Sequence, residues 1–312
     1  MAEQLMQALM SSAEARHHYE LLKPAPAPEA SQVDQQLLER GIARIAMSLN
    51  EGDFQRLTTG FEASIATCPD LLADSYHIVD ERLGNSAGYV RKERKINAAG
   101  RQIEDPKSLI HFTESAHDRW NVQYKTAPKV LREFLADGRE VQNELLNIAK
   151  RQLLGLETTH PNLSRLYFPA DGTGSLSFLR ILSYDSYDVS SSYAAVAKPH
   201  FDIGGVTIQA YADAAGFWGA KDGPHDERVH YDTEPNSAFC FLGMEHAKIY
   251  GDDSPLKPLW HGVDRIIPKG VAHVPTRHAV ILFVDAPRVD HAITAHDTLP
   301  DIHKSVRTVA SS

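Results

Sequence analysis

The sequence predicts an α+β fold, in which a mainly helical first half packs against an antiparallel β-structure formed by the second half. Between residues 33 and 160, apolar residues recur at three- and four-residue intervals, as amphipathic helices require. After Leu163 the chain instead forms short β-rich runs, punctuated by Gly, Pro, Asp and Asn, without helical segments between them. Strands at this spacing are typical of an antiparallel sandwich or barrel.

The domain boundaries follow from the same pattern. Residues 1–32 are expected to form a leader, because the alternation of proline and alanine over Lys23–Pro28 suits neither a regular helix nor a central strand. No clean linker separates the helical half from the β-rich half. A single domain is therefore expected over residues 33–312, with a C-terminal tail over residues 291–312.

The helices of the first half are predicted from apolar spacing and capping signals. A first helix is expected over residues 37–46 and a second over residues 53–66. Asp105 and Pro106 indicate a further helix start, with Asp as the cap and Pro at the first helical position. A long helix should run from about residue 128 to residue 156, because its apolar residues form one continuous stripe.

The strands of the second half are predicted from runs rich in β-branched and aromatic residues. Each run is short and is bounded by turn-forming residues. The expected strands cover residues 175–184, 206–211, 238–242, 265–267 and 279–284.

Composition and charge exclude several classes of function. The chain has 312 residues and a formal net charge of −9, which argues against a nucleic-acid-binding protein because such proteins usually carry a basic surface. No apolar run approaches the roughly 18 residues of a membrane helix, and the first twenty residues lack the features of a secretory signal. Two cysteines cannot form a disulfide framework. We therefore expect a cytoplasmic location.

The segment that indicates chemistry is Lys198–Ile208, which contains the sequence His-Phe-Asp at residues 200–202. In an extended segment, side chains two residues apart point to the same face. His200 and Asp202 therefore project together, as two of the three ligands of the facial triad that binds non-haem iron(II). The alternative is a hydrogen-bonded structural pair in a strand.

A third ligand must come from elsewhere in the β-rich half. His261 is the candidate, in a segment that lies 59 residues after Asp202. His246 is a second choice for the same role. Further along, Arg277 opens an apolar strand, where a buried guanidinium is unfavourable unless a carboxylate pairs with it. Its planar fork suits bidentate binding of a carboxylate, although an ordinary salt bridge is the alternative.

These residues, taken in order, resemble the isopenicillin N synthase-like branch of the iron(II)- and 2-oxoglutarate-dependent oxygenases. The resemblance covers residues 176–287 and is best in five places. They are Arg180–Tyr184, His200–Thr207, Gly216–Phe217, His261–Val263 and Arg277–Phe283. The helical first half agrees with the family in layout only.

The resemblance implies a double-stranded β-helix (a jelly-roll, cupin-like core) over residues 161–290, buttressed by the N-terminal helices. It implies an enzyme that uses iron(II), 2-oxoglutarate and O₂ to hydroxylate an unactivated C–H bond of a small molecule, releasing succinate and CO₂. Halogenating relatives lack the metal-binding carboxylate, so its presence favours hydroxylation. The implied metal ligands are His200, Asp202 and His261, and the implied cosubstrate residues are Arg277 and Tyr184.

Two departures from the family pattern leave alternatives open. Ala279 stands where the family usually has serine, which removes one hydrogen bond to 2-oxoglutarate. The interval of 16 residues between His261 and Arg277 is also long for the family, which suggests an inserted turn. The alternatives are a related iron oxidase that does not use 2-oxoglutarate and catalyses oxidative cyclisation or desaturation, and a non-catalytic barrel that binds a ligand.

The substrate residues are predicted from position alone. Arg82, Tyr89 and Arg91 lie where related enzymes draw substrate contacts from the helical half. If they face the pocket, the substrate is anionic. Phe217 is a further candidate, with core packing as its alternative role.

Overall fold

The structure is a computed structural model of the chain. It describes residues 30–78, 87–92, 95–96, 102–104, 106–156, 163–168, 177–188, 195–250, 254–264, 266–267 and 270–285. Residues 1–29 of the expected leader and the whole expected tail lie outside these ranges. Within them, no helix is both long and apolar enough to cross a membrane.

The first half of the chain contains both helices and strands, and strands dominate the second half. The helices are α3 (Ala30–Arg40), α4 (Glu51–Thr67), α5 (Pro69–Ser75), α6 (Glu114–Tyr124), α7 (Lys129–Leu156), α8 (Leu163–Tyr167) and α9 (Met244–Tyr250). The strands are β1 (Ile42–Ala46), β2 (His77–Ile78), β3 (Ala87–Lys92), β4 (Lys95–Ile96), β5 (Gln102–Glu104), β6 (Lys107–Phe112), β7 (Phe178–Tyr184), β8 (Tyr187–Asp188), β9 (Ala195–His200), β10 (Val206–Ala212), β11 (Phe217–Ala220), β12 (Val229–His230), β13 (Ser237–Leu242), β14 (Trp260–Asp264), β15 (His273–Val274) and β16 (Arg277–Val284).

Two antiparallel sheets form the core. The large sheet has the order β1-β13-β10-β16-β7-β6-β3-β2, and the small sheet has the order β12-β11-β14-β9. Along the chain from β7 to β16, the strands alternate between the two sheets, apart from the β11–β12 hairpin and from β8 and β15, which pair only with each other. This alternation is the arrangement of a jelly roll. The predicted α+β class with a jelly-roll core is therefore confirmed.

The large sheet also contains strands from the first half, where the sequence predicts helix. The helix start expected at Pro106 is wrong, because the following residues form β6, which pairs with β3 on one side and β7 on the other. All six residues of β6 are buried. Strand propensity depends strongly on packing, and here pairing between two strands outweighs the local capping signal.

The helix expected over residues 37–46 is also only partly correct. Helix α3 ends at Arg40, and Gly41 follows with a positive φ of 71°, its N–H bonding to the carbonyl of Leu37. Glycine adopts this conformation without the strain of a Cβ, so it ends the helix. Residues 42–46 then pair with β13 as strand β1.

The strand expected at residues 265–267 is displaced. The chain pairs with β11 and β9 through β14, which ends at Asp264. Ile266 and Ile267 lie outside the strand and are exposed. Their β-branched side chains suit a strand, but no neighbouring strand reaches them among the described residues.

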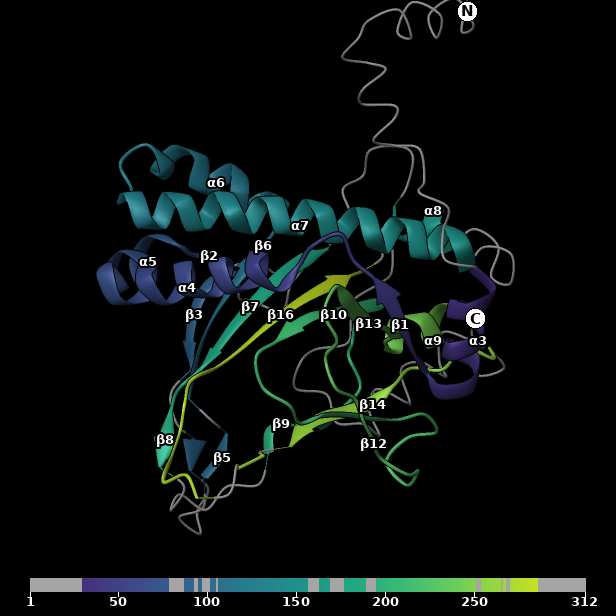
Figure 1. The fold of residues 1–312 in the computed structure, drawn as a ribbon. Coiled ribbons are helices and arrows are strands. Elements are labelled where there is room, and N and C mark those ends of the chain that lie inside the picture. Colours follow the sequence, from purple (N-terminus) through teal and green to yellow (C-terminus); the bar gives the residue numbers. More distant parts are fainter. Residues whose placement is uncertain are drawn as a thin grey trace, which may run out of the picture.

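Helices α4, α6 and α7 cover the face of the large sheet that points away from the small sheet (Figure 1). The expected helices at residues 53–66 and 128–156 are confirmed as α4 and α7. Asn50 caps α4 in a reciprocal capping box with Asp53. In α7, Gly138 allows close approach of Phe112, because a Cβ there would overlap the phenyl ring.

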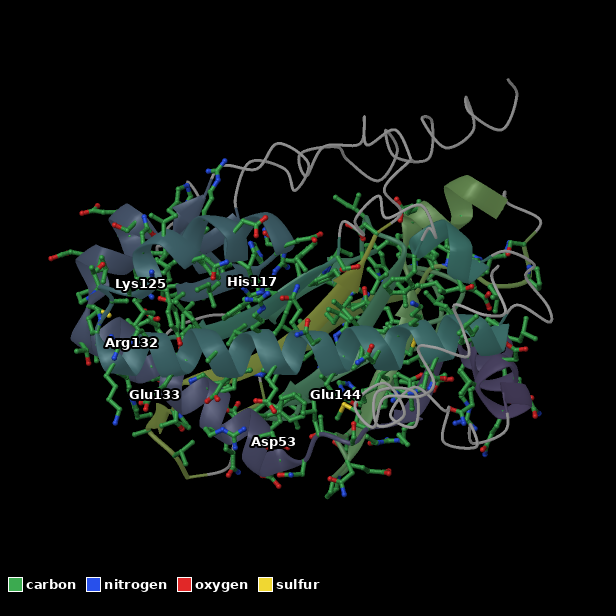
Figure 2. The ribbon with its side chains drawn as sticks, turned by 90° about the horizontal axis from the view of Figure 1, so that it is seen from above. Asp53, His117, Lys125, Arg132, Glu133 and Glu144 are labelled. Carbon is green, nitrogen blue, oxygen red and sulfur yellow. The ribbon has the colours of Figure 1, made fainter. Side chains whose placement is uncertain are left out.

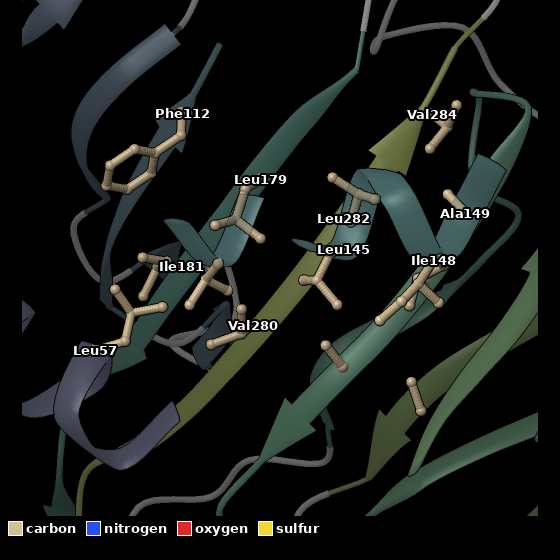
Figure 3. Packing of buried hydrophobic residues seen from close by; sticks show 14 of the residues in the cluster. Leu57, Phe112, Leu145, Ile148, Ala149, Leu179, Ile181, Val280, Leu282 and Val284 are labelled. Atoms are coloured by element: carbon tan, nitrogen blue, oxygen red, sulfur yellow. The ribbon is translucent and has the colours of Figure 1, made fainter. Parts of the chain in front are cut away.

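Apolar side chains of α7 and α4 pack against the large sheet (Figure 3). Each fully buried leucine or isoleucine in this layer contributes about 1.5–3 kcal/mol. The polar face of α7 points outward, where Figure 2 labels Arg132, Glu133 and Glu144. The residues labelled in Figure 3 are Leu57, Phe112, Leu145, Ile148, Ala149, Leu179, Ile181, Val280, Leu282 and Val284.

His278 connects helix α4 to the start of β16. Its Nε2 lies 3.0 Å from Glu62 Oε1 on α4, and its Nδ1 lies 2.7 Å from Asp213 Oδ2. Burial alone would lower the pKa of His278, but the hydrogen bonds and charges of Asp213 and Glu62 outweigh burial and raise it to about 9. The folded chain therefore retains a proton on His278 that the unfolded chain releases at lower pH.

We expect the free energy of unfolding to decrease as the pH rises from 6.5 to about 9. The contribution of His278 is complete below the unfolded pKa of 6.5 and is lost as the pH rises through about 9. The full difference in pKa corresponds to about 3.4 kcal/mol, and the partial solvent exposure of this group reduces the expected loss to on the order of 2 kcal/mol. Urea denaturation on both sides of this window should show a smaller decrease in His278→Gln than in the wild type. Equal decreases would contradict the role of His278.

Candidate metal centre and its cavity

The small sheet brings two histidines together. His200 ends β9, and His261 lies opposite it on β14, so the two residues are direct cross-strand partners. Side chains of such partners lie on the same face. Their ring centroids are 4.5 Å apart. The chain then turns after His200 and brings Asp202 to the same place.

The three predicted metal ligands form one cluster. Asp202 Oδ1 lies 3.4 Å from His200 Nε2 and 3.7 Å from His261 Nε2. One donor atom from each residue falls within 4.8 Å of the others. Bonds of about 2.0–2.2 Å to one ion place neighbouring donors roughly 3 Å apart. Two imidazoles and one carboxylate at these distances fit the two-histidine, one-carboxylate triad of non-haem iron(II).

Backbone and hydroxyl groups orient the three ligands. His200 Nδ1 lies 2.7 Å from the carbonyl of Lys198, and His261 Nδ1 lies 3.0 Å from the carbonyl of Leu259. A carbonyl can only accept, so each Nδ1 carries the proton and each Nε2 presents its lone pair. The Thr207 hydroxyl donates to Asp202 Oδ2 at 2.6 Å. Asp202 Oδ1 remains directed at the histidines.

The charge of the cluster suits a cation. Burial opposes ionisation of Asp202, but the neighbouring His261 and His200 and the Thr207 hydroxyl hold the pKa of Asp202 well below its usual value. Burial is the main cause that lowers the pKa of His261, which keeps that ring neutral. Burial would also lower the pKa of His200, but the hydrogen bond with Asp202 raises it. An ionised carboxylate beside a neutral imidazole is the state that binds a metal ion.

Two glycines after Asp202 allow the turn that places it. A Cβ on Gly205 would overlap the ring of Tyr167, and a Cβ on Gly204 would overlap the carboxylate of Asp285. These glycines belong to the sequence motif that follows the first two ligands. Their role is steric, because only a residue without a side chain fits between α8 and the end of β16.

The cluster opens into a cavity of about 420 Å³ between the two sheets. This volume lies within the range of about 300–1,000 Å³ for small-molecule sites. Inward-facing residues of the large sheet form one wall, and the metal cluster and Phe217 lie on the other. The lining from the large sheet comprises Val90, Lys92, Lys107, Leu109, His111, Arg180, Leu182, Tyr184, Thr207, Gln209, Phe241, Arg277, Ala279, Ile281 and Phe283.

Arg277 faces this cavity from the start of β16 and is 8% exposed. Its Nε and Nη2 have no hydrogen-bond partner within the described part of the chain. Burial is the main cause that lowers the pKa of the Arg277 guanidinium, and the nearby Tyr184 and Asp213 oppose that effect. Buried N–H donors without acceptors are unfavourable, so this side chain is suited to receive an anion from the cavity.

Arg277, Tyr184 and Lys107 lie side by side on the three adjacent strands β16, β7 and β6. The register places Arg277 opposite Tyr184 on β7, and Tyr184 opposite Lys107 on β6. The Arg277 Cζ lies 5.7 Å, and the Lys107 Nζ 4.9 Å, from the centroid of the Tyr184 ring. The structure therefore places both predicted cosubstrate residues in the cavity and adds a second cation beside them.

Tyr89 and Arg91 do not face the cavity, which corrects our expectation for them. Tyr89 packs against Phe61 of α4, and Arg91 forms an ion pair with Asp185. Their neighbours Val90 and Lys92 line the cavity instead. Alternate residues of a strand point to opposite faces, so a prediction displaced by one residue selects the wrong face. The third candidate, Arg82, lies outside the described residues.

The remaining candidates are also placed by the structure. Phe217 lines the cavity and has its ring centroid 5.9 Å from that of His261. His246, the second choice for the third ligand, is buried on α9 and is not part of the metal cluster. His278 points away from the cavity, as expected from its position next to Arg277.

Besides Lys92, two charged residues of the cavity were not predicted from the sequence as site residues, Arg180 and Lys107. Arg180 lies in the apolar strand Phe178–Tyr184, at even spacing from Tyr184, and this alternation was the available signal. Lys107 could not be found in the same way, because its segment was predicted to be helical. Its inward orientation follows only from the pairing of β6 with β7.

Comparisons with known proteins agree with this architecture. No protein-family model matches the sequence, and no curated protein matches it. Solved structures do match. A full-length Neurospora crassa protein, solved in complex with alpha-KG (2-oxoglutarate), has a TM-score of 0.64 and 12% identity, and the match covers 93% of each chain.

Two further structures show the same likeness. A candidate oxygenase from Shewanella oneidensis has a TM-score of 0.62 and 19% identity, with coverage of 93% of this chain and 98% of that one. The Arabidopsis thaliana dioxygenase for auxin oxidation 1, in complex with 2-oxoglutarate, has a TM-score of 0.61 and 15% identity, with coverage of 83% and 88%. The chain thus shares the fold of the 2-oxoglutarate- and iron(II)-dependent oxygenases.

Proposed function

We propose that the chain is an iron(II)- and 2-oxoglutarate-dependent oxygenase that hydroxylates a C–H bond of a small molecule. One observation carries the proposal. A His-Asp-His cluster and a buried guanidinium without a partner among the described residues face the same cavity. The first suits a divalent metal ion and the second suits a carboxylate, which are the two requirements of this chemistry.

Each residue has a defined part in this proposal. His200, Asp202 and His261 would hold iron(II) on one side of the ion, leaving its other positions open. Arg277 and Tyr184 would bind the far carboxylate of 2-oxoglutarate. When bound, iron and 2-oxoglutarate supply the oxidising chemistry, in which O₂ is consumed and succinate, CO₂ and the hydroxylated product are formed.

The rest of the cavity positions the substrate and excludes water. Leu109, Leu182, Phe217 and Phe241 supply an apolar lining between the metal cluster and Arg277. A dry lining strengthens the electrostatic interactions of the charged groups and holds the reacting carbon close to the metal. The Neurospora crassa protein has also been solved with thymine and with 5-formyluracil, which supports a small-molecule substrate for the same fold here.

The proposal is tested by measuring the binding of iron(II) to the protein, and then the binding of 2-oxoglutarate. Anaerobic addition of iron(II) and then 2-oxoglutarate should give the visible charge-transfer band of an iron-bound 2-oxo acid. Admission of O₂ should then release succinate. Iron binding without the band would indicate an oxidase that does not use 2-oxoglutarate. Absence of iron binding would mean that His200, Asp202 and His261 do not form a metal centre.

Lys107→Met should weaken 2-oxoglutarate binding about tenfold while leaving iron binding unchanged. Ala279 cannot supply the hydroxyl that the family usually has, and Lys107 offers a second positive charge beside Tyr184. A hydrogen bond to a charged group contributes about 1.5–3 kcal/mol, so loss of one is readily measured. Titration of the charge-transfer band gives the affinity. Unchanged affinity in Lys107→Met would remove Lys107 from the cosubstrate site.

A related oxidase without 2-oxoglutarate remains the second candidate because of Ala279. This residue lines the cavity and faces the same space as Arg277. A methyl group there gives 2-oxoglutarate one fewer donor. Stoichiometric succinate release excludes this candidate, and it also excludes a non-catalytic binding module.

A further inference from the structure

We propose that the cavity contains a second anion site at Arg180, and that the substrate therefore carries a carboxylate group that binds there. This inference rests on the proposed oxygenase function, because it assigns the substrate class of the same cavity. Arg180 lies on the inner face of β7 together with Leu182 and Tyr184. In the proposed function, Arg180 binds neither iron nor 2-oxoglutarate.

The two arginines of the cavity are well separated. Arg277 lies opposite Tyr184, whereas Arg180 lies opposite Ile281 on the neighbouring strand β16. Arg180 and Tyr184 are four residues apart on a strand that rises about 3.3 Å per residue, which separates their Cα atoms by roughly 13 Å. The Arg277 guanidinium lies near Tyr184, whereas the Arg180 guanidinium lies near Phe178 and Phe283, at the other end of the two strands. The two guanidinium groups therefore form separate anion sites.

Arg180 lies at the metal end of the cavity. Its Cζ lies 4.7 Å from the ring centroid of Phe283 and 5.4 Å from that of Phe178. Phe283 is the direct partner of Thr207, the residue whose hydroxyl holds Asp202. The guanidinium is thus on the side of the large sheet next to the metal ligands, whereas Arg277 is at the far end.

The guanidinium of Arg180 is held in place but not neutralised. Its Nε donates to His111 Nε2 at 2.7 Å, and this is its only hydrogen bond to a described residue. No described carboxylate forms an ion pair with it, although the charges of Asp202 and Asp285 act on it from nearby. Arginine has five N–H donors in a planar fork, so donors remain for an acceptor in the cavity.

Charge complementarity identifies that acceptor. The charges of iron(II) and fully ionised 2-oxoglutarate cancel each other. Among the described lining residues, Asp202 is the only carboxylate, whereas Arg180, Arg277, Lys92 and Lys107 have basic side chains, so the lining has an excess of positive charge. The Arg180 guanidinium contributes to this excess in apolar surroundings, beside Phe178 and Phe283. Burying an unpaired charge is unfavourable, and a carboxylate matches the geometry of the guanidinium fork. The apolar lining would accept the hydrocarbon part of such an acid.

The experiment uses matched acids and amides as probes. Propionate, butyrate, hexanoate and 3-phenylpropionate are titrated calorimetrically into the full chain, and so are the corresponding neutral amides. Each titration is done with iron(II) and 2-oxoglutarate bound anaerobically, and again without them. The proteins are the wild type, Arg180→Met, Arg180→Lys, and Arg228→Met, in which a cation stacked on Trp218 outside the cavity is removed.

We expect the acids to bind the wild type about tenfold or more tightly than their amides, because a charge-assisted hydrogen bond to the guanidinium is stronger than a neutral one. Arg180→Met should lose this preference, Arg180→Lys should retain part of it, and Arg228→Met should retain all of it. The charge-transfer band with 2-oxoglutarate should persist in Arg180→Met, and thermal denaturation should show that this variant is folded.

Three outcomes would overturn the second anion site. They are amides that bind as tightly as acids, an acid preference that survives in Arg180→Met, and no millimolar binding of any acid to the wild type. Loss of the 2-oxoglutarate band in Arg180→Met would instead assign Arg180 to the cosubstrate, and the proposal would again fail. Failure of the proposed function is separate, because it appears as no iron or 2-oxoglutarate binding in the wild type.

Discussion

Asp202→Ala should abolish tight iron(II) binding, with a loss of affinity of at least about a hundredfold. Changes in residues that merely orient metal ligands typically reduce affinity about 10–100-fold, and loss of a ligand should exceed this. Asp202 is the only carboxylate of the described cluster and lies within 3.7 Å of both histidine Nε2 atoms. Removing it leaves two imidazoles and takes away the negative charge that attracts the cation.

The measurement is anaerobic titration with iron(II), with manganese(II) as a second probe. Thr207→Val is the graded comparison, because it removes only the hydroxyl that holds Asp202 Oδ2, and it should weaken binding about tenfold. Asp264→Asn is the matched control. Asp264 lies on β14, the strand of His261, but accepts a hydrogen bond from Trp218, outside the cavity. Equal affinities in Asp202→Ala and Asp264→Asn would reject the metal centre.

Arg277→Met should reduce the affinity for 2-oxoglutarate about a hundredfold to a thousandfold while leaving iron binding unchanged. Removing one partner of a buried ion pair costs about 3–5 kcal/mol, because the other charge stays buried without compensation. Arg277 is buried, and its Nε and Nη2 have no acceptor among the described residues. The carboxylate of 2-oxoglutarate would be left facing Tyr184 and Lys107.

Titration of the charge-transfer band measures this loss, and direct iron titration supplies the comparison. Arg277→Lys should recover only part of the affinity, because lysine keeps the charge but loses the planar fork. Arg180→Met tests whether removal of the other arginine of the cavity also weakens 2-oxoglutarate binding. This variant should keep the wild-type affinity for 2-oxoglutarate. A selective loss in Arg180→Met, with normal binding in Arg277→Met, would exchange the roles of the two arginines.

Local patterns predicted the elements whose signals lie within one segment. Helices α4 and α7 follow from apolar spacing, because a helix forms all its backbone hydrogen bonds within itself. The strands β10, β13 and β16 were found for a similar reason, since each is an apolar run between turn residues. Strand β6 was missed because its partners β3 and β7 lie elsewhere in the chain. Its local capping signal indicated a helix.

Some residues of the candidate site could likewise be predicted from local sequence, whereas others required the tertiary structure. The spacing of His200 and Asp202, the later His261 and the arginine that opens a strand are all readable in the sequence, because each depends on residue type and order. The choice between Arg91 and Lys92 is not readable, because it depends on which face of β3 meets the cavity. That face is set by the register with β6, and a shift of one residue reverses it.

By itself, then, the sequence determined the fold class, the three metal-binding candidates and the arginine suited to a carboxylate. Local periodicity and the chemistry of the side chains were sufficient for these. The tertiary structure decided which side chains share the cavity. It paired His200 with His261 across two strands, placed Lys107 beside Tyr184, and left Arg180 facing the metal end without an ion-pair partner among the described residues. Such neighbours depend on strand pairing between distant segments, which no single stretch of sequence encodes.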